Sequence, residues 1–394
     1  FQSGMAVLVS QYWGRGDTDN INRCIGVALY AVTGFSTVLA LITFFFPAQV
    51  LGLITPNQAL IDLATSYIQI VGFSYIFNGI SSIYAGVQRS TEYPAFGMFL
   101  FGISMCVNTF LNYVLIFGKF GAPALGVTGA AIATFTSRVV EFLVALGFAL
   151  CNRRLPLRPR YIFHPGSFIF RSFVKYSTPV VANEAMWSLG TSMLTVIMGH
   201  MENSQDMLAA YALIGNIDKL STVVCFGIAA SAAVIVGKEI GAGTDHKKVY
   251  EISWTLLLVS LMIGAGVMLL LLGLLPIFFQ PVLFPLFKLS SGATLAATSM
   301  AIVYAVFMPM RAFDITNITG VLRAGGDARI ASVIDITPLW LVAIPLMAVT
   351  ALVLNAPAPL VCIAMQAENL CKCPLGLIRF HSRKWIHDIT RIGQ

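Results

Sequence analysis

The chain has 394 residues, of which 57% are hydrophobic and only 10% are charged. Soluble proteins carry roughly 25% charged residues, so this composition excludes a soluble or secreted globular protein and indicates an integral membrane protein with several spans. The net charge of +7 does not indicate a nucleic-acid partner, because the basic residues lie between apolar runs and not along one face.

The first apolar segment, residues 1–14, is too short to cross a bilayer at ~1.5 Å per residue, and it indicates the inner end of a longer helix. Each of the apolar runs that follow reaches the ~20 residues that a span needs. There are ten of them, at residues 22–47, 58–87, 94–118, 124–150, 170–198, 207–237, 249–279, 292–320, 330–353 and 357–378. We therefore predict an all-α polytopic membrane protein.

The basic residues concentrate in every second connection between these runs. Eighteen of the 24 Lys and Arg lie there, namely Arg15, Arg23, Arg89, Arg153, Arg154, Arg158, Arg160, Arg171, Lys175, Lys238, Lys247, Lys248, Arg323, Arg329, Arg379, Arg383, Lys384 and Arg391. The positive-inside rule places such loops in the cytoplasm. We expect a multi-pass protein of the cytoplasmic membrane whose C-terminus is cytoplasmic.

The chain also repeats itself at a spacing of about 230 residues. Gly14-Arg-Gly16 recurs as Gly241-Ala-Gly243, and the turn at residues 88–93 recurs at residues 322–327. This predicts two six-helix lobes related by a pseudo-two-fold axis along the membrane normal, with the first lobe incomplete at its N-terminus. The expected divisions are an N-terminal lobe at 1–150, a cytoplasmic linker at 151–169, a C-terminal lobe at 170–378 and a cytoplasmic tail at 379–394.

Three carboxylates, Glu184, Asp314 and Asp335, lie inside apolar runs of the second lobe. Each is eight or nine positions from a charged turn residue, or ~12–14 Å from the cytoplasmic edge, near the middle of a ~30 Å core. Ionisable groups at that depth are costly and are functional by default. We predict that the three carboxylates form a cation site, in which they either bind Na⁺ as metal ligands or share a proton. Asn183 and Thr316 supply further oxygens.

Arg311 precedes Asp314 by three positions, so both lie on one helix face. Either the two form a buried ion pair that neutralises both, or Arg311 modulates the charge of Asp314 during transport. Arg138 and Glu141 have the same spacing and indicate a structural pair. Asp218, about twenty positions before Lys238, is expected to be solvated or to line a cavity near the outer surface.

Two asparagines, Asn108 and Asn112, share a face of the run 94–118. They either line a substrate cavity in the first lobe or hydrogen-bond across helices. The sequence contains neither a P-loop nor a Gly-x-Ser-x-Gly motif. We therefore expect no enzyme, no direct use of ATP and no cofactor beyond a coupling ion.

Four segments resemble one known family, the multidrug and toxic compound extrusion (MATE) family of cation-coupled antiporters. Residues 10–17 are similar to the end of its second helix, and residues 179–184 to its seventh. The Leu-Arg-Ala-Gly-Gly-Asp turn at residues 322–327 resembles its tenth-to-eleventh turn, and residues 379–385 resemble the tail of bacterial members. The resemblance covers essentially the whole chain.

The resemblance implies twelve helices in two lobes and the export of organic cations and drugs, driven by Na⁺ or H⁺. Its second-lobe cation carboxylates map onto Glu184, Asp314 and Asp335. Its other ion site lies on the first helix, which we expect this chain to lack. The implied partners are a cationic or amphipathic small molecule and the bilayer, and we expect a monomer. The alternative is a flippase for lipid-linked precursors, which needs several basic residues in its cavity.

Overall fold

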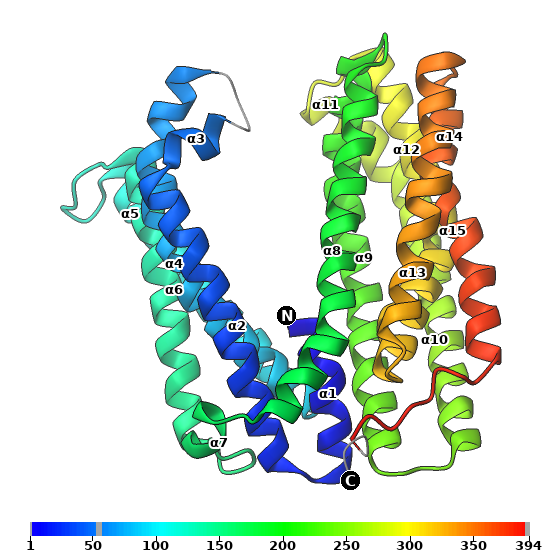
Figure 1. The fold of residues 1–394 in the computed structure, drawn as a ribbon. Coiled ribbons are helices and arrows are strands. Elements are labelled where there is room, and N and C mark those ends of the chain that lie inside the picture. Colours follow the sequence, from blue (N-terminus) through cyan, green and yellow to red (C-terminus); the bar gives the residue numbers. More distant parts are fainter. Residues whose placement is uncertain (1, 53–56, 391–394) are drawn as a thin grey trace. The chain divides into compact units, whose positions relative to one another are not determined.

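The structure, a computed structural model, describes residues 2–52 and 57–390. Arg391, one of the basic residues of the predicted cytoplasmic tail, lies outside this description, as does Phe1 of the predicted short segment. All regular structure in the described part is helical, which confirms the predicted all-α fold. The chain divides into two compact units, residues 1–175 and 176–394, drawn in Figure 1.

The first unit is built from seven helices and the start of an eighth, within the described residues. They are α1 (Gln2–Arg15), α2 (Thr18–Phe45), α3 (Pro47–Gly52), α4 (Gln58–Ser90), α5 (Ala95–Phe117), α6 (Gly126–Cys151), α7 (Pro159–Phe163) and α8 (Ser167–Gly199). Side chains start two of these helices, because Asp17 caps α2 and Asn57 caps α4 through backbone N–H groups. Helix α4 packs against both α2 and α6.

The short helix α7 lies directly on α2. A Cβ added at Gly26 would lie 2.1 Å from the Ile162 carbonyl oxygen, so only glycine permits this approach. The Asn22 amide extends the contact by donating to the Pro156 carbonyl and accepting from the Arg158 N–H. These contacts fix the basic segment after α6 to the first unit.

The second unit holds the rest of the helices. They are α9 (Ser204–Gly241), α10 (His246–Leu274), η1 (Leu275–Leu283), α11 (Phe284–Leu286), α12 (Ser291–Ile315), η2 (Thr316–Leu322), α13 (Ala328–Pro338), η3 (Leu339–Ala343), α14 (Ile344–Ala348), η4 (Val349–Val353) and α15 (Ala358–His381). The η segments are π-helical turns that continue the α-helix before them, and such turns are frequent at functional sites.

Helix α12 is the centre of the second unit, where it packs against α9, α10 and α15. Its buried face is rich in small side chains, namely Ala293, Ala296, Ala297, Ser299, Ala301, Ala305 and Ala312. Small residues let helix backbones approach closely inside a membrane. Neighbouring helices therefore also surround the polar side chains on the buried face of α12.

Eight helices of the described chain are long and apolar enough to cross a membrane, and they correspond to eight of the ten predicted runs. The other two runs fall on α8 and α15, which are long but less apolar. These two helices carry Glu184 and Lys372. Both helices contribute to the charged interior described next.

Candidate cation site and ion-pair network of the second unit

Helix α8 brings Asn183 and Glu184 against α13. The Asn183 amide nitrogen donates to Asp335 Oδ2 at 2.9 Å, and Ser332 Oγ donates to the Pro179 carbonyl at 3.1 Å. Pro179 lies inside α8 and has no backbone N–H to donate. Two of the predicted site residues, Asn183 and Asp335, are therefore in direct contact, and Glu184 is next to them on α8.

Arg323 joins Glu184 to Asp335. The residue follows η2, and its side chain is only 4% exposed. Its guanidinium donates to Glu184 Oε1 at 3.2 Å, and it is 3.6 Å from Asp335 Oδ2. From the sequence, Arg323 is predicted to lie in a cytoplasmic loop, whereas in the structure its side chain points into the protein interior. The Glu184 side chain is 59% exposed.

Lys372 on α15 is the second buried cation. Its Nζ is 2.9 Å from Asp335 Oδ1 and 3.0 Å from Glu368 Oε2. Glu368 is one helical turn before Lys372 on the same face. Asp335 is thus held from both sides, by Lys372 on one oxygen and by Asn183 and Arg323 on the other.

Asp314 has a different environment. It lies on the buried face of α12 and is 3% exposed, yet neither carboxyl oxygen has a hydrogen-bond partner among the described residues. Lys372, Asp335 and Glu368 lie within electrostatic range of it. Asn317, one turn further on, also has no partner for its amide atoms. Buried polar atoms without partners call for water, an ion or a proton.

The third of these predicted carboxylates therefore belongs to the same region but does not share its ion pairs. Thr316, predicted to supply an oxygen, is fully buried and its Oγ1 has no partner in the described chain. Because it follows Asp314 by two positions, its side chain leaves α12 in a different direction. The polar atoms nearest to Asp314 along the helix face are those of Asn317.

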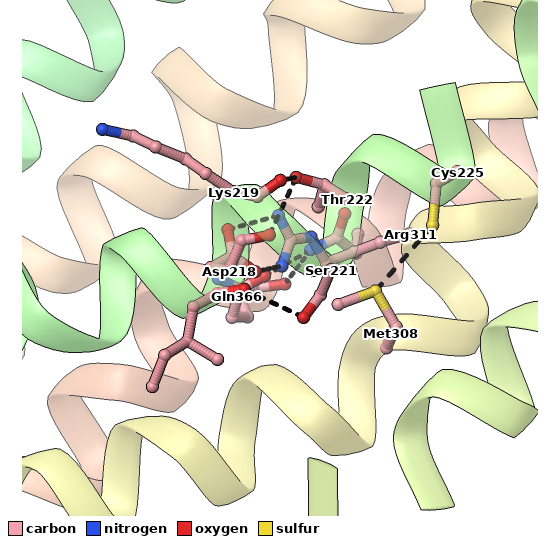
Figure 2. A network of polar contacts seen from close by, with 10 residues as sticks. Asp218, Lys219, Ser221, Thr222, Cys225, Met308, Arg311 and Gln366 are labelled. Atoms are coloured by element: carbon pink, nitrogen blue, oxygen red, sulfur yellow. Dashed lines mark hydrogen bonds and ion pairs between the residues drawn. The ribbon is translucent and has the colours of Figure 1, made fainter. Parts of the chain in front are cut away.

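Arg311 is paired with Asp218 and not with Asp314. The guanidinium donates to the two carboxylate oxygens of Asp218 at 2.5 and 3.0 Å, and Figure 2 shows this pair between α12 and α9. The Tyr304 ring adds a cation–π contact at 5.7 Å. The predicted buried pair between Arg311 and Asp314 is therefore wrong, because the partner of Arg311 is Asp218 from another helix.

The prediction for Asp218 is confirmed only in part. Asp218 does line a small pocket, together with Ile214, Ile217, Leu271, Phe279, Ala301 and Tyr304. Its side chain is only 17% exposed, however, so it is not solvated. The structure therefore supports a cavity-lining Asp218 and not a solvated one.

In the first unit, Asn112 donates to Asn108 Oδ1 at 3.0 Å, and Asn108 donates to Thr134 on α6 at 3.4 Å. This geometry favours hydrogen bonding between helices over a cavity lining. Arg138 and Glu141 form the predicted structural pair at 2.6 Å. Glu141 is fully buried there.

Sequence reasoning missed Arg323, Lys372 and Glu368 as members of the site. Lys372 and Glu368 had a visible signal, because two opposite charges four positions apart inside the apolar run 357–378 are themselves a functional indication. Arg323 had none, since a loop arginine and an inward-turned arginine look alike in a sequence.

Long apolar helices around a buried network of charges are typical of membrane transporters. The chain belongs to the MatE family, because the sequence model of that family matches residues 1–114 and 179–349, which is more than half of the chain. The family expected from the sequence motifs is thereby confirmed.

Curated relatives agree with this assignment. The chain is 24% identical over 386 residues to the uncharacterized transporter YisQ of Bacillus subtilis, covering 98% of this chain and 82% of that one. It is 26% identical over 363 residues to the probable multidrug resistance protein NorM of Thermotoga maritima, covering 91% and 73%. Identities of 24% and 26% support a shared family and do not identify a shared substrate.

Solved structures show the same fold. A MOP superfamily transporter from Pyrococcus furiosus, described as having a binding pocket of reverse polarity, matches with a TM-score of 0.84 at 17% identity over 97% of this chain and 83% of that one. The Vibrio cholerae MATE transporter VcmN in its bent form matches with a TM-score of 0.82 at 17% identity over 97% and 84%. At this identity the likeness concerns the fold alone.

Proposed function

We propose that this chain is a cation-coupled antiporter that exports organic cations and drugs by alternating access. Family membership supports a transporter, and the names of relatives such as the NorM proteins support drug-like substrates. The observation that carries the coupling is Asp314, a buried carboxyl without a hydrogen-bond partner in the described chain, beside a network of ion pairs. A cation at Asp314 would remove that deficit.

The coupling follows from the packing of the network. Arg323 contacts side chains from α8 and α13, and Lys372 on α15 contacts Asp335 on α13. A charge added near Asp314 changes the field on three helices that contact one another through these side chains. Cation binding would bias one conformational state, provided that the two states bind it with different affinity, and substrate binding would bias the other.

The alternative, a flippase for lipid-linked precursors, needs basic side chains that can bind a pyrophosphate. In the described part of the second unit, Arg311, Arg323 and Lys372 are each within ion-pair distance of a carboxylate. Their positive charge is already compensated. This favours the antiporter over the flippase.

The test is efflux in proteoliposomes under separately imposed Na⁺ and pH gradients, with a fluorescent organic cation as the probe. We expect uptake of the probe against its gradient when one of the two ion gradients is present and none when both are absent. Equal transport with and without both gradients contradicts cation coupling. A matched control is the same preparation of Asp314→Asn, which should not respond to either gradient.

The proposed setting is the cytoplasmic membrane, with the C-terminus on the cytoplasmic side and a monomeric chain. The concentration of Lys and Arg in alternate connections supports this orientation. A single cysteine at exposed Ser382, in a variant without other cysteines, should react with an impermeant thiol reagent only in inverted vesicles. Reaction in intact cells contradicts the orientation.

A further inference from the structure

Lys372 occupies an unusual position for a lysine. Its side chain is 6% exposed, inside the long helix α15, with Nζ between one oxygen of Asp335 and one of Glu368. The two carboxylates come from different helices, α13 and α15. A buried ammonium is costly unless carboxylates surround it, and here both contacts are about 3 Å long.

Three of the four carboxylates of the region are paired with a cationic side chain without any bound ion. Four carboxylates, those of Glu184, Asp314, Asp335 and Glu368, face the two cations Arg323 and Lys372. Arg323 contacts Glu184 and Asp335, and Lys372 contacts Asp335 and Glu368. Only Asp314 has neither contact.

A sodium ion in this region would need the carboxylate oxygens that Lys372 already contacts. It carries the same single charge, and as a hard cation it would have to take carboxylate oxygens as ligands. The oxygens of Asp335 already bind Lys372 and Asn183, and Lys372 also lies within electrostatic range of Asp314. A second cation would meet repulsion from the ammonium in a poorly screened interior.

We infer that Lys372 is a tethered counter-cation that fills the position a coupling sodium ion would take, so the second unit binds no Na⁺ while Lys372 is present. This rests on the proposed function and narrows it, because it removes Na⁺ from the two ions considered for this unit. It also predicts that neutralising Lys372 creates a sodium site from Asp335, Glu368 and Asp314.

The experiment measures equilibrium binding of radiolabelled Na⁺ to the purified full chain in detergent, at constant ionic strength set with choline chloride. We compare the wild type with Lys372→Met, which removes the charge at similar length, and with Lys372→Arg, which keeps it. The matched control is Lys384→Met, at an exposed lysine outside the network. Gel filtration shows which variants are folded.

We expect saturable Na⁺ binding in Lys372→Met only, with an affinity at least about tenfold above that of the other proteins. The double variant Lys372→Met/Glu368→Gln should bind Na⁺ more weakly than Lys372→Met, because one negatively charged ligand is removed. A lysine with only a packing role would lower stability on substitution but would not create binding.

Two results overturn the inference. One is saturable Na⁺ binding to the wild type. The other is a folded Lys372→Met that binds no more Na⁺ than Lys384→Met. If Lys372→Met does not fold, the wild-type measurement decides alone. Binding requires no transport, so the inference can stand or fall separately from gradient-driven efflux, which tests the proposed function.

Discussion

The Arg323 guanidinium lies 3.2 Å from Glu184 Oε1 and connects the end of η2 to α8. Arg323 is 4% exposed and Glu184 is 59% exposed, so the pair has one buried and one exposed member. The exposed Glu184 can leave this pair while the buried arginine keeps its second partner, Asp335. Glu184 is therefore the member of the network best placed to change partners during transport.

Glu184→Gln should keep the chain folded and reduce gradient-driven efflux by roughly tenfold or more. The amide keeps the size of the side chain but removes its charge, and about 1.4 kcal/mol of lost interaction corresponds to that factor in a partly screened pair. The measurement is efflux in proteoliposomes at matched protein density. Glu202→Gln, in the exposed turn between α8 and α9, is the control. Efflux equal to that of the control removes Glu184 from the coupling mechanism.

Asp314→Asn should abolish the response to ion gradients without loss of thermal stability. The carboxyl makes no hydrogen bond within the described chain, so its replacement by a neutral isostere sacrifices no partner. The melting temperature in detergent should stay within a few degrees of the wild type or rise. A large fall in melting temperature would mean that Asp314 has a structural partner.

Asp218→Asn, unlike Asp314→Asn, should lower the thermal stability of the protein. It removes the charge that compensates Arg311, whose guanidinium is held by both Asp218 oxygens. An uncompensated buried charge costs about 3 kcal/mol. We expect a clear fall in melting temperature, measured beside Asp245→Asn as an exposed acidic control before α10. An unchanged melting temperature would show that Arg311 does not depend on this partner.

The double variant Asp218→Asn/Arg311→Met extends this test. Removing both charges leaves no buried ion, so stability should recover relative to Asp218→Asn by a coupling free energy of about 2 kcal/mol. The cycle is measured from the melting temperatures of the four proteins. Strictly additive effects of the two substitutions would contradict a direct interaction between these residues.

The sequence was sufficient for the helices because hydrophobicity over ~20 residues is a local property. It also predicted the direct contact region of Asn183, Glu184 and Asp335, since charges inside apolar runs are costly and tend to cluster. The expectation that Asp218 is solvated failed, because this side chain packs between helices and pairs with Arg311.

Which charges pair could not be read from the sequence. Arg311 has an acidic residue three positions away, but its partner Asp218 is 93 positions away. A long arginine side chain can reach several neighbouring helices, and tertiary packing decides among them. The same freedom turns Arg323 from a loop toward the interior. Spacing along one helix therefore indicated charged residues of interest but not their contacts.

The C-terminal segment after α15 packs on the turn between η2 and α13, next to Arg323. Trp385 is fully buried there, the His387 N–H donates to the Gly325 carbonyl at 2.9 Å, and Arg379 binds Asp327 at 2.6 Å. A Cβ at Gly325 would lie 2.3 Å from Trp385 Cε3 and 2.5 Å from its carbonyl oxygen. Such overlap cannot be relieved by a small side-chain movement.

Gly325→Ala should therefore displace the tail and destabilise the second unit by roughly 2 kcal/mol, the usual cost of overpacking. Because the turn positions Arg323, gradient-driven efflux should fall as well. The control is Gly266→Ala on α10, where an added Cβ meets no atom within 4 Å. Thermal unfolding and protease accessibility of the tail measure the effect. A Gly325→Ala protein with the melting temperature and tail protection of the control would show that the tail does not hold this turn in place.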